Sequence, residues 1–293
     1  MSPVLHDQAL LLMAHGSRDA EARDEYRRIH AALAERIAPT PVVFSVLEFP
    51  DDDGLSSIQD GWRQCLRLGA RRVVGLPFFL FPAGHVRQDL PEELRAARAS
   101  VGWAELDLLP PLGAADELLD AVETRVREAA GPDAGPDTAV ILVGAGTSDP
   151  DANSDLCKAA RLLWERCNDR YALVETAWVS LTRPTVGEAV ERCIRLGAER
   201  IAVVPYFLNT GVLLKRIDER LAELPGSGPS VQIARGAHLG LHPRLLDLLE
   251  RRARAGLDRV EDLDGLMAVC GRPSCASVAR ERSGLLRPGA SVS

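Results

Sequence analysis

The stretch LLMAHGSRDAEARDEYRRIHAALAER, residues 11–36, occurs a second time as ILVGAGTSDPDANSDLCKAARLLWER, residues 141–166. Farther along, CLRLGARRVVGLPFFLFPAGHVRQDLPEEL from residue 65 matches CIRLGAERIAVVPYFLNTGVLLKRIDERL from residue 193. The chain of 293 residues is therefore a tandem duplication. Aligning the copies places His15 opposite Ala145, and His85 opposite Val212 or Leu213. Because the second copy replaces both histidines with apolar residues, the fold does not require them.

Each copy alternates short apolar runs with helical patterns. Residues 9–14 are wholly apolar, as expected of a parallel strand that is buried on both faces. The first copy predicts strands at 9–14, 41–49, 72–81 and 103–108, and helices at 19–37, 56–68, 90–99 and 114–129. The second predicts strands at 138–143, 173–179, 200–207 and 231–234, and helices from 151 and at 186–196, 212–224 and 243–253. This order predicts an α/β protein with two tandem domains, each an open parallel sheet with helices on both faces.

The domain boundaries follow from the repeat and from one linker. The segment GPDAGPD, residues 131–137, has the composition of a connection between domains. It separates a predicted N-terminal domain, residues 1–130, from a predicted C-terminal domain, residues 138–255. The pattern fades in a tail, residues 256–293, which ends in Pro, Gly and Ser and is expected to be partly mobile.

Composition excludes several classes of protein. The formal net charge is −7 and no long basic run occurs, so no nucleic-acid partner is expected. No apolar stretch approaches ~20 residues and the N-terminus has no signal-peptide pattern, so we expect a cytoplasmic protein without a membrane contact. Six scattered cysteines do not form a disulfide framework. No glycine-rich dinucleotide motif or Walker loop is present, which argues against nucleotide cofactors.

Three polar residues of the first copy are predicted to meet at one edge of its sheet. His15 follows the first strand, Glu48 ends the second and His85 follows the third. Ligands of open parallel α/β sheets bind outside the carboxyl ends of the strands. Two imidazoles and a carboxylate at that edge can bind a divalent metal ion or exchange protons near neutral pH. The second copy lacks all three, which favours a functional site over a structural role.

Structural roles remain the alternative for several neighbouring residues. Ser17 follows His15 and is interpreted as a helix N-cap, because the second copy keeps a hydroxyl residue there. His238 and His242 occur only in the second copy, and His242 is a weaker candidate ligand. His6 and His30 lie away from the predicted site and are interpreted as surface residues.

The segments LLMAHGSRD, VLEF and PFFLFPAGHV resemble the class II tetrapyrrole chelatases, specifically the sirohydrochlorin chelatases of cobalamin and sirohaem synthesis. The similarity covers nearly the whole chain and matches the long form, in which two chelatase-like domains are fused. It implies that a macrocycle binds in the cleft between the halves. It also implies that the catalytic, metal-binding histidines are His15 and His85 and that their acidic partner is Glu48.

The resemblance implies a lyase that exchanges two pyrrole N–H protons of sirohydrochlorin for one divalent cation. Neutral imidazole can act as both metal ligand and base, so no cofactor is required. The metal is a substrate; Co²⁺ is favoured over Fe²⁺, although the residues alone do not distinguish them. Because the two halves are fused, a monomer is expected. The substrate carries many carboxylates, and the candidate cations for binding it are Arg18, Arg87, Lys215 and Arg216.

Two further functions and one further site stay open. A non-catalytic metal or tetrapyrrole carrier with the same fold is the main alternative, and a metal-dependent hydrolase is a more distant one. Cys270 and Cys275 in the tail resemble the cysteine pair that some long members link to an iron–sulfur centre. Their C-x₄-C spacing and the missing further thiolates favour a plain pair of thiols over a cluster.

Overall fold

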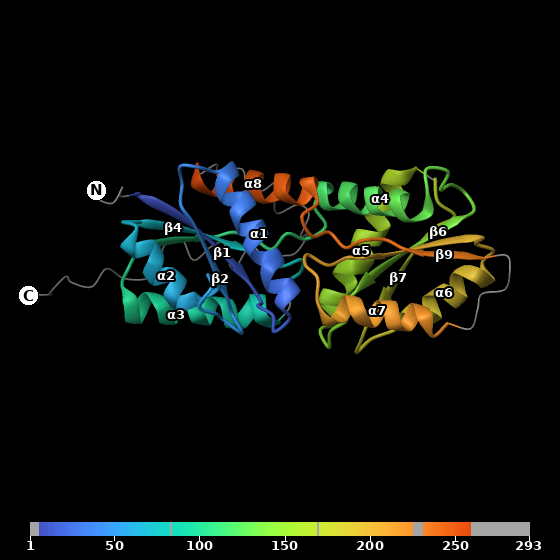
Figure 1. Cartoon of the computed structure of the whole chain (residues 1–293), viewed down its shortest axis with the longest axis horizontal. Helices are drawn as coiled ribbons and strands as arrows, with labels where there is room; N and C mark the ends of the chain where they lie inside the picture. The colour runs from blue at the N-terminus through green and yellow to red at the C-terminus, as the bar shows by residue number, and fades with distance from the viewer. Residues whose placement is uncertain (1–5, 83, 169, 225–230, 259–293) are drawn as a thin grey trace, which may run out of the picture.

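The structure is a computed structural model that describes residues 6–82, 84–168, 170–224 and 231–258. Two separate parallel sheets lie side by side along the long axis of the molecule (Figure 1). The sheet of the first half has the strand order β3-β2-β1-β4-β5, and that of the second half has the order β7-β6-β8-β9. The predicted α/β fold with tandem open parallel sheets is confirmed.

The first sheet is built around a fully apolar strand. Strand β1, Gln8–Ala14, pairs in parallel with β2 and β4, and its residues from Ala9 on are buried. Helices on both faces hide these side chains, as expected for a central strand of this kind. The elements of this half are β1 Gln8–Ala14, α1 Ala20–Arg36, β2 Val42–Val46, β3 Ser56–Ser57, α2 Ile58–Arg67, β4 Arg72–Pro77, a π-helix His85–Asp89, α3 Leu90–Val101, β5 Glu105–Leu108 and α4 Asp116–Ala130.

The second sheet repeats this plan without the short strand β3. Its central strand β6, Thr138–Gly144, is buried along its whole length and pairs in parallel with β7 and β8. The elements of this half are β6 Thr138–Gly144, α5 Pro150–Cys167, β7 Leu173–Trp178, α6 Val186–Arg195, β8 Arg200–Pro205, α7 Val212–Ala222, β9 Gln232–Arg235 and α8 Pro243–Leu257. Among the described residues, no helix has the length and apolar character needed to cross a membrane.

The last helix of each half packs on the sheet of the other half. Helix α4 contacts β8, β9 and α5, whereas α8 contacts β4, β1 and α1 (Figure 1). The first sheet is therefore covered by α1 and α8 on one face and by α2 and α3 on the other, and the second by α4 and α5 and by α6 and α7. Each half lends one helix to its neighbour, so neither half is complete without the other.

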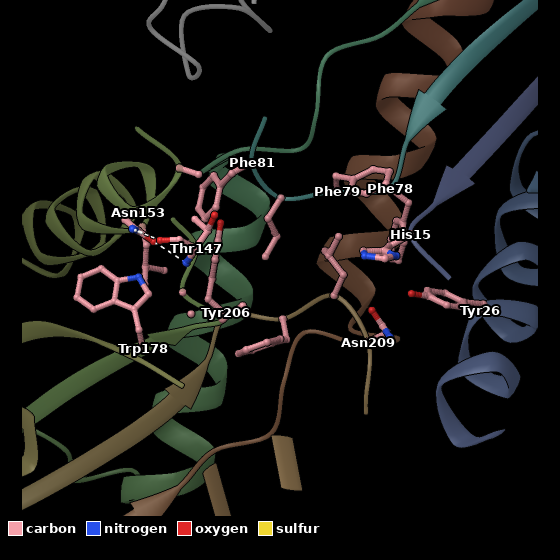
Figure 2. A pocket seen from close by; sticks show the side chains of 18 residues that line it. His15, Tyr26, Phe78, Phe79, Phe81, Thr147, Asn153, Trp178, Tyr206 and Asn209 are labelled. Carbon is pink, nitrogen blue, oxygen red and sulfur yellow. Dashed lines mark hydrogen bonds between the residues drawn. The ribbon is translucent and has the colours of Figure 1, made fainter. Parts of the chain in front are cut away.

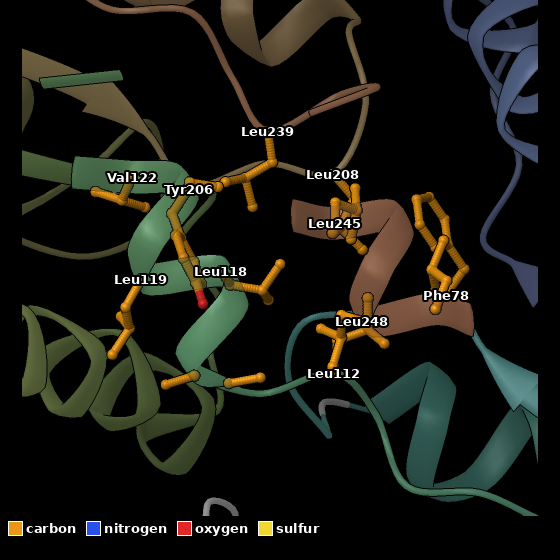
Figure 3. Packing of buried hydrophobic residues seen from close by; sticks show 14 of the residues in the cluster. Phe78, Leu112, Leu118, Leu119, Val122, Tyr206, Leu208, Leu239, Leu245 and Leu248 are labelled. Carbon is orange, nitrogen blue, oxygen red and sulfur yellow. The ribbon is translucent and has the colours of Figure 1, made fainter. Parts of the chain in front are cut away.

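One hydrophobic core runs through both halves as a result of this exchange. Leu118 and Val122 of α4, Leu245 and Leu248 of α8, and Tyr206 after β8 belong to the same buried cluster (Figure 3). The outer faces of the sheets have separate cores under α2 and α3 and under α6 and α7. The shared core fixes the two halves against each other and shapes the space between their sheets.

Two buried arginines secure α8 on the first half. Arg252 of α8 is 2% exposed and donates to the carbonyl oxygens of Pro110, Pro111 and Leu112 at 3.1–3.2 Å. Arg72 of β4 donates to the carbonyl oxygens of Gly256 at 2.6 Å and Leu257 at 3.1 Å, while it pairs with Asp107. Buried charge of this kind is tolerated only when its donors are satisfied. These bonds fix both the middle and the C-terminal end of α8.

Several predicted boundaries were wrong in detail. Strand β2 ends at Val46 and β4 at Pro77, both earlier than expected. After β4 the segment 78–81 leaves the sheet and lines the space between the halves. The short strand β3 and the π-helix at His85 were not predicted. Ser17 is not the N-cap of α1: Asp19 caps the helix, and the Ser17 hydroxyl accepts from the Asp19 N–H at 3.1 Å.

Candidate active site between the two halves

A pocket of about 250 Å³ lies where the carboxyl ends of the two sheets face each other (Figure 2). The first half contributes His15, Tyr26 and the segment 78–81, and the second half contributes the loop after β6 and the segment 206–209. The wall is mostly aromatic and aliphatic, with a few polar groups, as is typical of a small-molecule site. Its residues are His15, Tyr26, Phe78, Phe79, Leu80, Phe81, Gly144, Ala145, Gly146, Thr147, Ala152, Asn153, Leu156, Trp178, Tyr206, Phe207, Leu208 and Asn209.

His15 reaches the pocket because it is the first residue after β1. Its carbonyl oxygen accepts from the Glu48 N–H at 2.8 Å, which ties the end of β1 to the chain leaving β2. Gly16 follows with φ +100, and a Cβ there would lie 1.8 Å from the Glu48 carbonyl oxygen. Only glycine permits this close approach in that conformation. The backbone that presents His15 is therefore closely constrained.

Glu48 and His85 lie at the same edge of the sheet as His15. Glu48 is two residues beyond β2 and is exposed. His85 begins the π-helix between β4 and α3, and its side chain lies outside the described part of the structure. Within the described part no group of three or more His, Cys, Asp or Glu side chains could hold a metal ion. The catalytic and metal-binding roles of His15, Glu48 and His85 stay predictions.

The second half repeats the backbone of this edge but not its polar side chains. The Ala145 carbonyl oxygen accepts from the Ser180 N–H at 3.0 Å, as that of His15 does from Glu48. Gly146 has φ +84, and a Cβ there would lie 1.8 Å from the Ser180 carbonyl oxygen, as at Gly16. Ala145 and Ser180 are thus the counterparts of His15 and Glu48. The backbone geometry is common to both halves, and the ionisable groups are confined to the first.

Two of the candidate substrate-binding cations form ion pairs across the halves. Arg87 forms ion pairs with Asp149 at 3.4 Å and Asp151 at 3.9 Å, at the start of α5. Lys215 of α7 pairs with Asp19 at 2.8 Å and with Glu21 at 3.8 Å, at the start of α1. The hydrogen bond from Lys215 is the main reason that the pKa of Asp19 lies below its ordinary value.

The other two candidate cations are exposed. The Arg18 guanidinium lies 4.5 Å from the centre of the Phe49 ring, directly after the His15 loop. Arg216 lies on α7, next to Lys215. A cation over an aromatic ring remains accessible to an anion at its free edge. Arg18 thus lies beside the candidate site. Arg216 is linked to the site only by its sequence position next to Lys215.

A buried carboxylate and an imidazole pair with each other across the halves, behind the pocket. Glu25 of α1 is 6% exposed, and its carboxylate lies 3.0 and 3.1 Å from the Nε2 atom of His238. The same carboxylate accepts from the Thr210 N–H at 2.6 Å. Burial alone would raise the pKa of Glu25, but the hydrogen bonds from His238 and Thr210 outweigh it and hold the pKa below its ordinary value. His242, the weaker candidate ligand, instead caps α8 by accepting from the Arg244 N–H at 3.2 Å.

We expect Glu25→Gln to unfold more easily than the parent protein at pH 7, by about 2 kcal/mol, because a charged buried acceptor is lost. The pKa of Glu25 is lower in the folded than in the unfolded state, so its stabilisation is full above the ordinary glutamate pKa. It is lost as the pH falls through the folded-state value. Urea unfolding at pH 7 and near pH 3 measures this; an equal difference between the two proteins at both pH values would contradict it.

Two polar residues of the pocket were missed from the sequence. Tyr26 is only 3% exposed, but its hydroxyl points into the pocket beside His15 and Asn209 (Figure 2). Burial raises the pKa of Tyr26 to about 12, so the hydroxyl keeps its proton at neutral pH. The repeat contained the signal, because Tyr26 aligns with Leu156 and Asn209 with Phe81. Polar residues present in one copy alone mark the His15 end of the pocket.

The fold and the pocket together define a duplicated α/β protein whose ligand site lies between its halves. The CbiX family model matches residues 9–129 and 139–255, and the chain belongs to this family. A sirohydrochlorin cobaltochelatase of Priestia megaterium is 37% identical over 253 residues, which cover 86% of this chain and 80% of that protein. A sirohydrochlorin ferrochelatase of the same organism is 29% identical, covering 84% and 89%.

Solved structures show the same similarity in three dimensions. SirB from Bacillus subtilis with Fe³⁺ superimposes with a TM-score of 0.75 at 26% identity, covering 87% of this chain and 98% of that one. The sirohydrochlorin chelatase SirB from Bacillus subtilis subspecies spizizenii in complex with cobalt gives a TM-score of 0.72 at 25% identity, covering 87% and 97%. The similarity thus extends over both halves and their relative arrangement.

Proposed function

We propose that this protein is a sirohydrochlorin chelatase, which inserts a divalent metal ion into the macrocycle. The observation that carries the proposal is the pocket between the halves, with an imidazole at one end and an aromatic wall. Relatives that match over most of the chain are sirohydrochlorin cobaltochelatases and ferrochelatases. The flat conjugated ring of the macrocycle can stack on a wall that contains Phe78, Phe81, Trp178 and Tyr206, with its carboxylates at the edge of the ring.

The chemistry assigns separate tasks to the residues of the first half. His15 and His85 deliver the metal ion and accept the two protons that leave the pyrrole nitrogens, because neutral imidazole can perform both tasks. Glu48 offsets the charge of the incoming cation. The second half closes the pocket and supplies none of these groups, since Ala145 and Ser180 stand in the equivalent positions.

Substrate entry requires the segments around the pocket to move apart, while the shared core keeps the halves together. A pocket of about 250 Å³ lies just below the roughly 300–1,000 Å³ that is usual for ligand sites. The ion pairs of Arg87 with Asp149 and of Lys215 with Asp19 join the halves beside it. Opening breaks these pairs and frees both cations for the carboxylates of the macrocycle. Arg18 and Arg216 are exposed and need no such exchange.

The metal, the compartment and the assembly are narrower proposals. Co²⁺ is the favoured ion, supported by the 37% identical cobaltochelatase, and Fe²⁺ is the second candidate. Metal and tetrapyrrole are substrates, and no bound cofactor is needed for the exchange of protons for metal. We propose a cytoplasmic monomer, since the two halves already enclose one pocket. Cys270 and Cys275 lie outside the described residues, and plain thiols remain the proposal for them.

Anaerobic metal insertion into sirohydrochlorin tests the function. The visible absorbance of the macrocycle should change with many turnovers per protein when Co²⁺ or Fe²⁺ is added, and faster with Co²⁺. A carrier with the same fold would bind the macrocycle or the metal stoichiometrically and would not exceed the uncatalysed rate. Binding without turnover for both ions would therefore replace the chelatase with a carrier.

A further inference from the structure

We propose that Tyr26 and Asn209 form a bridge between the halves that positions the His15 loop, so that His15 is correctly oriented only when the two halves are closed. Tyr26 belongs to α1 of the first half, and Asn209 follows β8 of the second half. The consequence for turnover rests on the proposed chelatase function. The bridge itself rests on contacts of the structure.

The hydroxyl of Tyr26 contacts both the His15 loop and the second half. It lies close to the Gly16 N–H, the peptide group directly after His15, and to the side chain of Asn209. Figure 2 shows the three side chains of His15, Tyr26 and Asn209 converging at one end of the pocket. The Glu48 N–H donates to the His15 carbonyl oxygen at 2.8 Å, and the Tyr26 hydroxyl lies beside the following peptide. The His15 peptide thus has a neighbouring polar group on each side.

The segment that carries Asn209 is itself tied to α1. The Thr210 N–H donates to the Glu25 carboxylate at 2.6 Å, and the same carboxylate lies 3.0 Å from His238. Consecutive residues of α1 therefore meet consecutive residues of the other half: Glu25 accepts from the Thr210 N–H, and Tyr26 lies beside Asn209. Because Glu25 is buried, this double contact is formed only when the halves are packed together.

The opposite end of the pocket cannot form the same bridge. Phe79 and Phe207 accept equivalent backbone hydrogen bonds, from Leu112 and Leu239, which fixes the alignment of the two segments. Phe81 and Pro82 then take the places of Asn209 and Thr210, and Leu156 takes the place of Tyr26. Proline has no N–H to donate, and leucine and phenylalanine offer no polar group. Phe81 stacks on Tyr206 instead, with ring centres 5.8 Å apart.

The equivalent loop of the second half is held from within its own half. Asn153 of α5 accepts from the Thr147 N–H at 3.1 Å and donates to the Thr147 carbonyl oxygen at 2.8 Å. This loop carries Ala145, whose methyl group has no polar atom to orient. The loop that carries His15 instead lies against Tyr26, whose hydroxyl in turn faces Asn209 of the opposite half. The orientation of His15 is therefore expected to depend on closure of the two halves.

The test is Tyr26→Phe, which removes the hydroxyl and keeps the ring packed against Phe44 and Phe78, with centres 5.5 and 6.3 Å away. Tyr171→Phe is the matched control, because Tyr171 is a buried tyrosine that does not line the pocket. We expect Tyr26→Phe to lower kcat for Co²⁺ insertion about 10-fold with KM nearly unchanged, since groups that orient a metal-binding histidine commonly contribute about 10- to 100-fold. The Tyr171→Phe variant should keep kcat within about twofold.

A double-mutant cycle with Asn209→Ala tests the pairing. If the two residues act as one bridge, the double variant should lose no more than about the larger single loss in kcat. Independent, multiplicative losses would overturn the pairing, and a rise in KM with unchanged kcat would show a substrate contact instead of a positioning role.

Calorimetric titration with Co²⁺ alone gives a readout that does not need turnover. The Tyr26→Phe variant should bind the ion about 5- to 10-fold more weakly than both the parent protein and Tyr171→Phe. A parent protein that binds Co²⁺ but inserts none would refute the chelatase function and leave this difference intact. An active parent protein with unchanged kcat and Co²⁺ affinity in Tyr26→Phe would refute the bridge alone.

Discussion

Replacing His15 with alanine is expected to lower metal insertion by about 100-fold or more, because the site loses a metal ligand and a proton acceptor together. His85→Ala should have a similar effect, as His85 begins the segment after the third strand of the same sheet edge. Neither change should disturb the fold, since the second half has the same backbone at this edge with Ala145 in place of His15. Initial rates with sirohydrochlorin and Co²⁺, together with thermal unfolding, measure both effects.

His6→Ala is the matched control for these variants. His6 lies before β1 at the opposite end of that strand, and its backbone N–H donates to the Leu68 carbonyl oxygen, a bond that alanine keeps. The control should insert metal at the parent rate. Near-normal turnover in both His15→Ala and His85→Ala would remove these residues from the mechanism.

Ending the chain after Asp258 should leave a folded enzyme that inserts metal within about twofold of the parent rate, whereas ending it after Leu241 should prevent folding. The second truncation removes α8, which covers the first sheet. The side chains of Leu245, Leu248 and Leu249 of α8 are fully buried. Burial of each contributes about 2 kcal/mol to the free energy of unfolding. Their sum is a large part of the roughly 5–15 kcal/mol that stabilises a typical domain.

The two truncations separate the tail from the exchanged helix. The longer truncated chain keeps the bonds from Arg72 to the carbonyl oxygens of Gly256 and Leu257, and it lacks Cys270 and Cys275. Circular dichroism, size-exclusion chromatography and the insertion assay measure the outcome. If the longer chain folds but is inactive, the tail contributes to the site. If the shorter chain folds normally, the role assigned to α8 is wrong.

The strands and the edge that carries the site could be predicted from the sequence because each depends on local chemistry. The apolar run before His15 is long enough for one strand and is buried throughout, and Gly16 marks the turn that follows it. The duplication then separated residues needed for the backbone from those that are not. Gly16 and Gly146 are kept in both copies because both approach a carbonyl oxygen closely, whereas His15 and Ala145 differ.

The exchange of α4 and α8 could not be predicted from the sequence. Both helices have one apolar face, and such a face indicates that a helix packs on a sheet without indicating which sheet. The choice depends on contacts between residues far apart in the chain, such as those of Arg252 with the carbonyl oxygens of Pro110 and Leu112. Sequence periodicity contains no information about these partners.

Tyr26 was missed for a related reason. Its spacing with Ile29 and Leu33 places it on one face of α1, and all three are buried. The hydroxyl at the end of that ring lines the pocket, where Asn209 of the second half lies beside it. A residue can thus belong to the core through its ring and to the site through one atom. The arrangement of the two halves decides the second role.

Anomalous diffraction at the cobalt edge from crystals of the protein soaked with Co²⁺ tests most directly the claim that the first half alone carries the chemistry. The expected result is one peak between the strand ends of the first half, within coordination distance of His15 and His85, which is lost in crystals of His15→Ala. Cobalt bound by side chains of the second half near Ala145 and Ser180, with no peak at His15, would contradict the account.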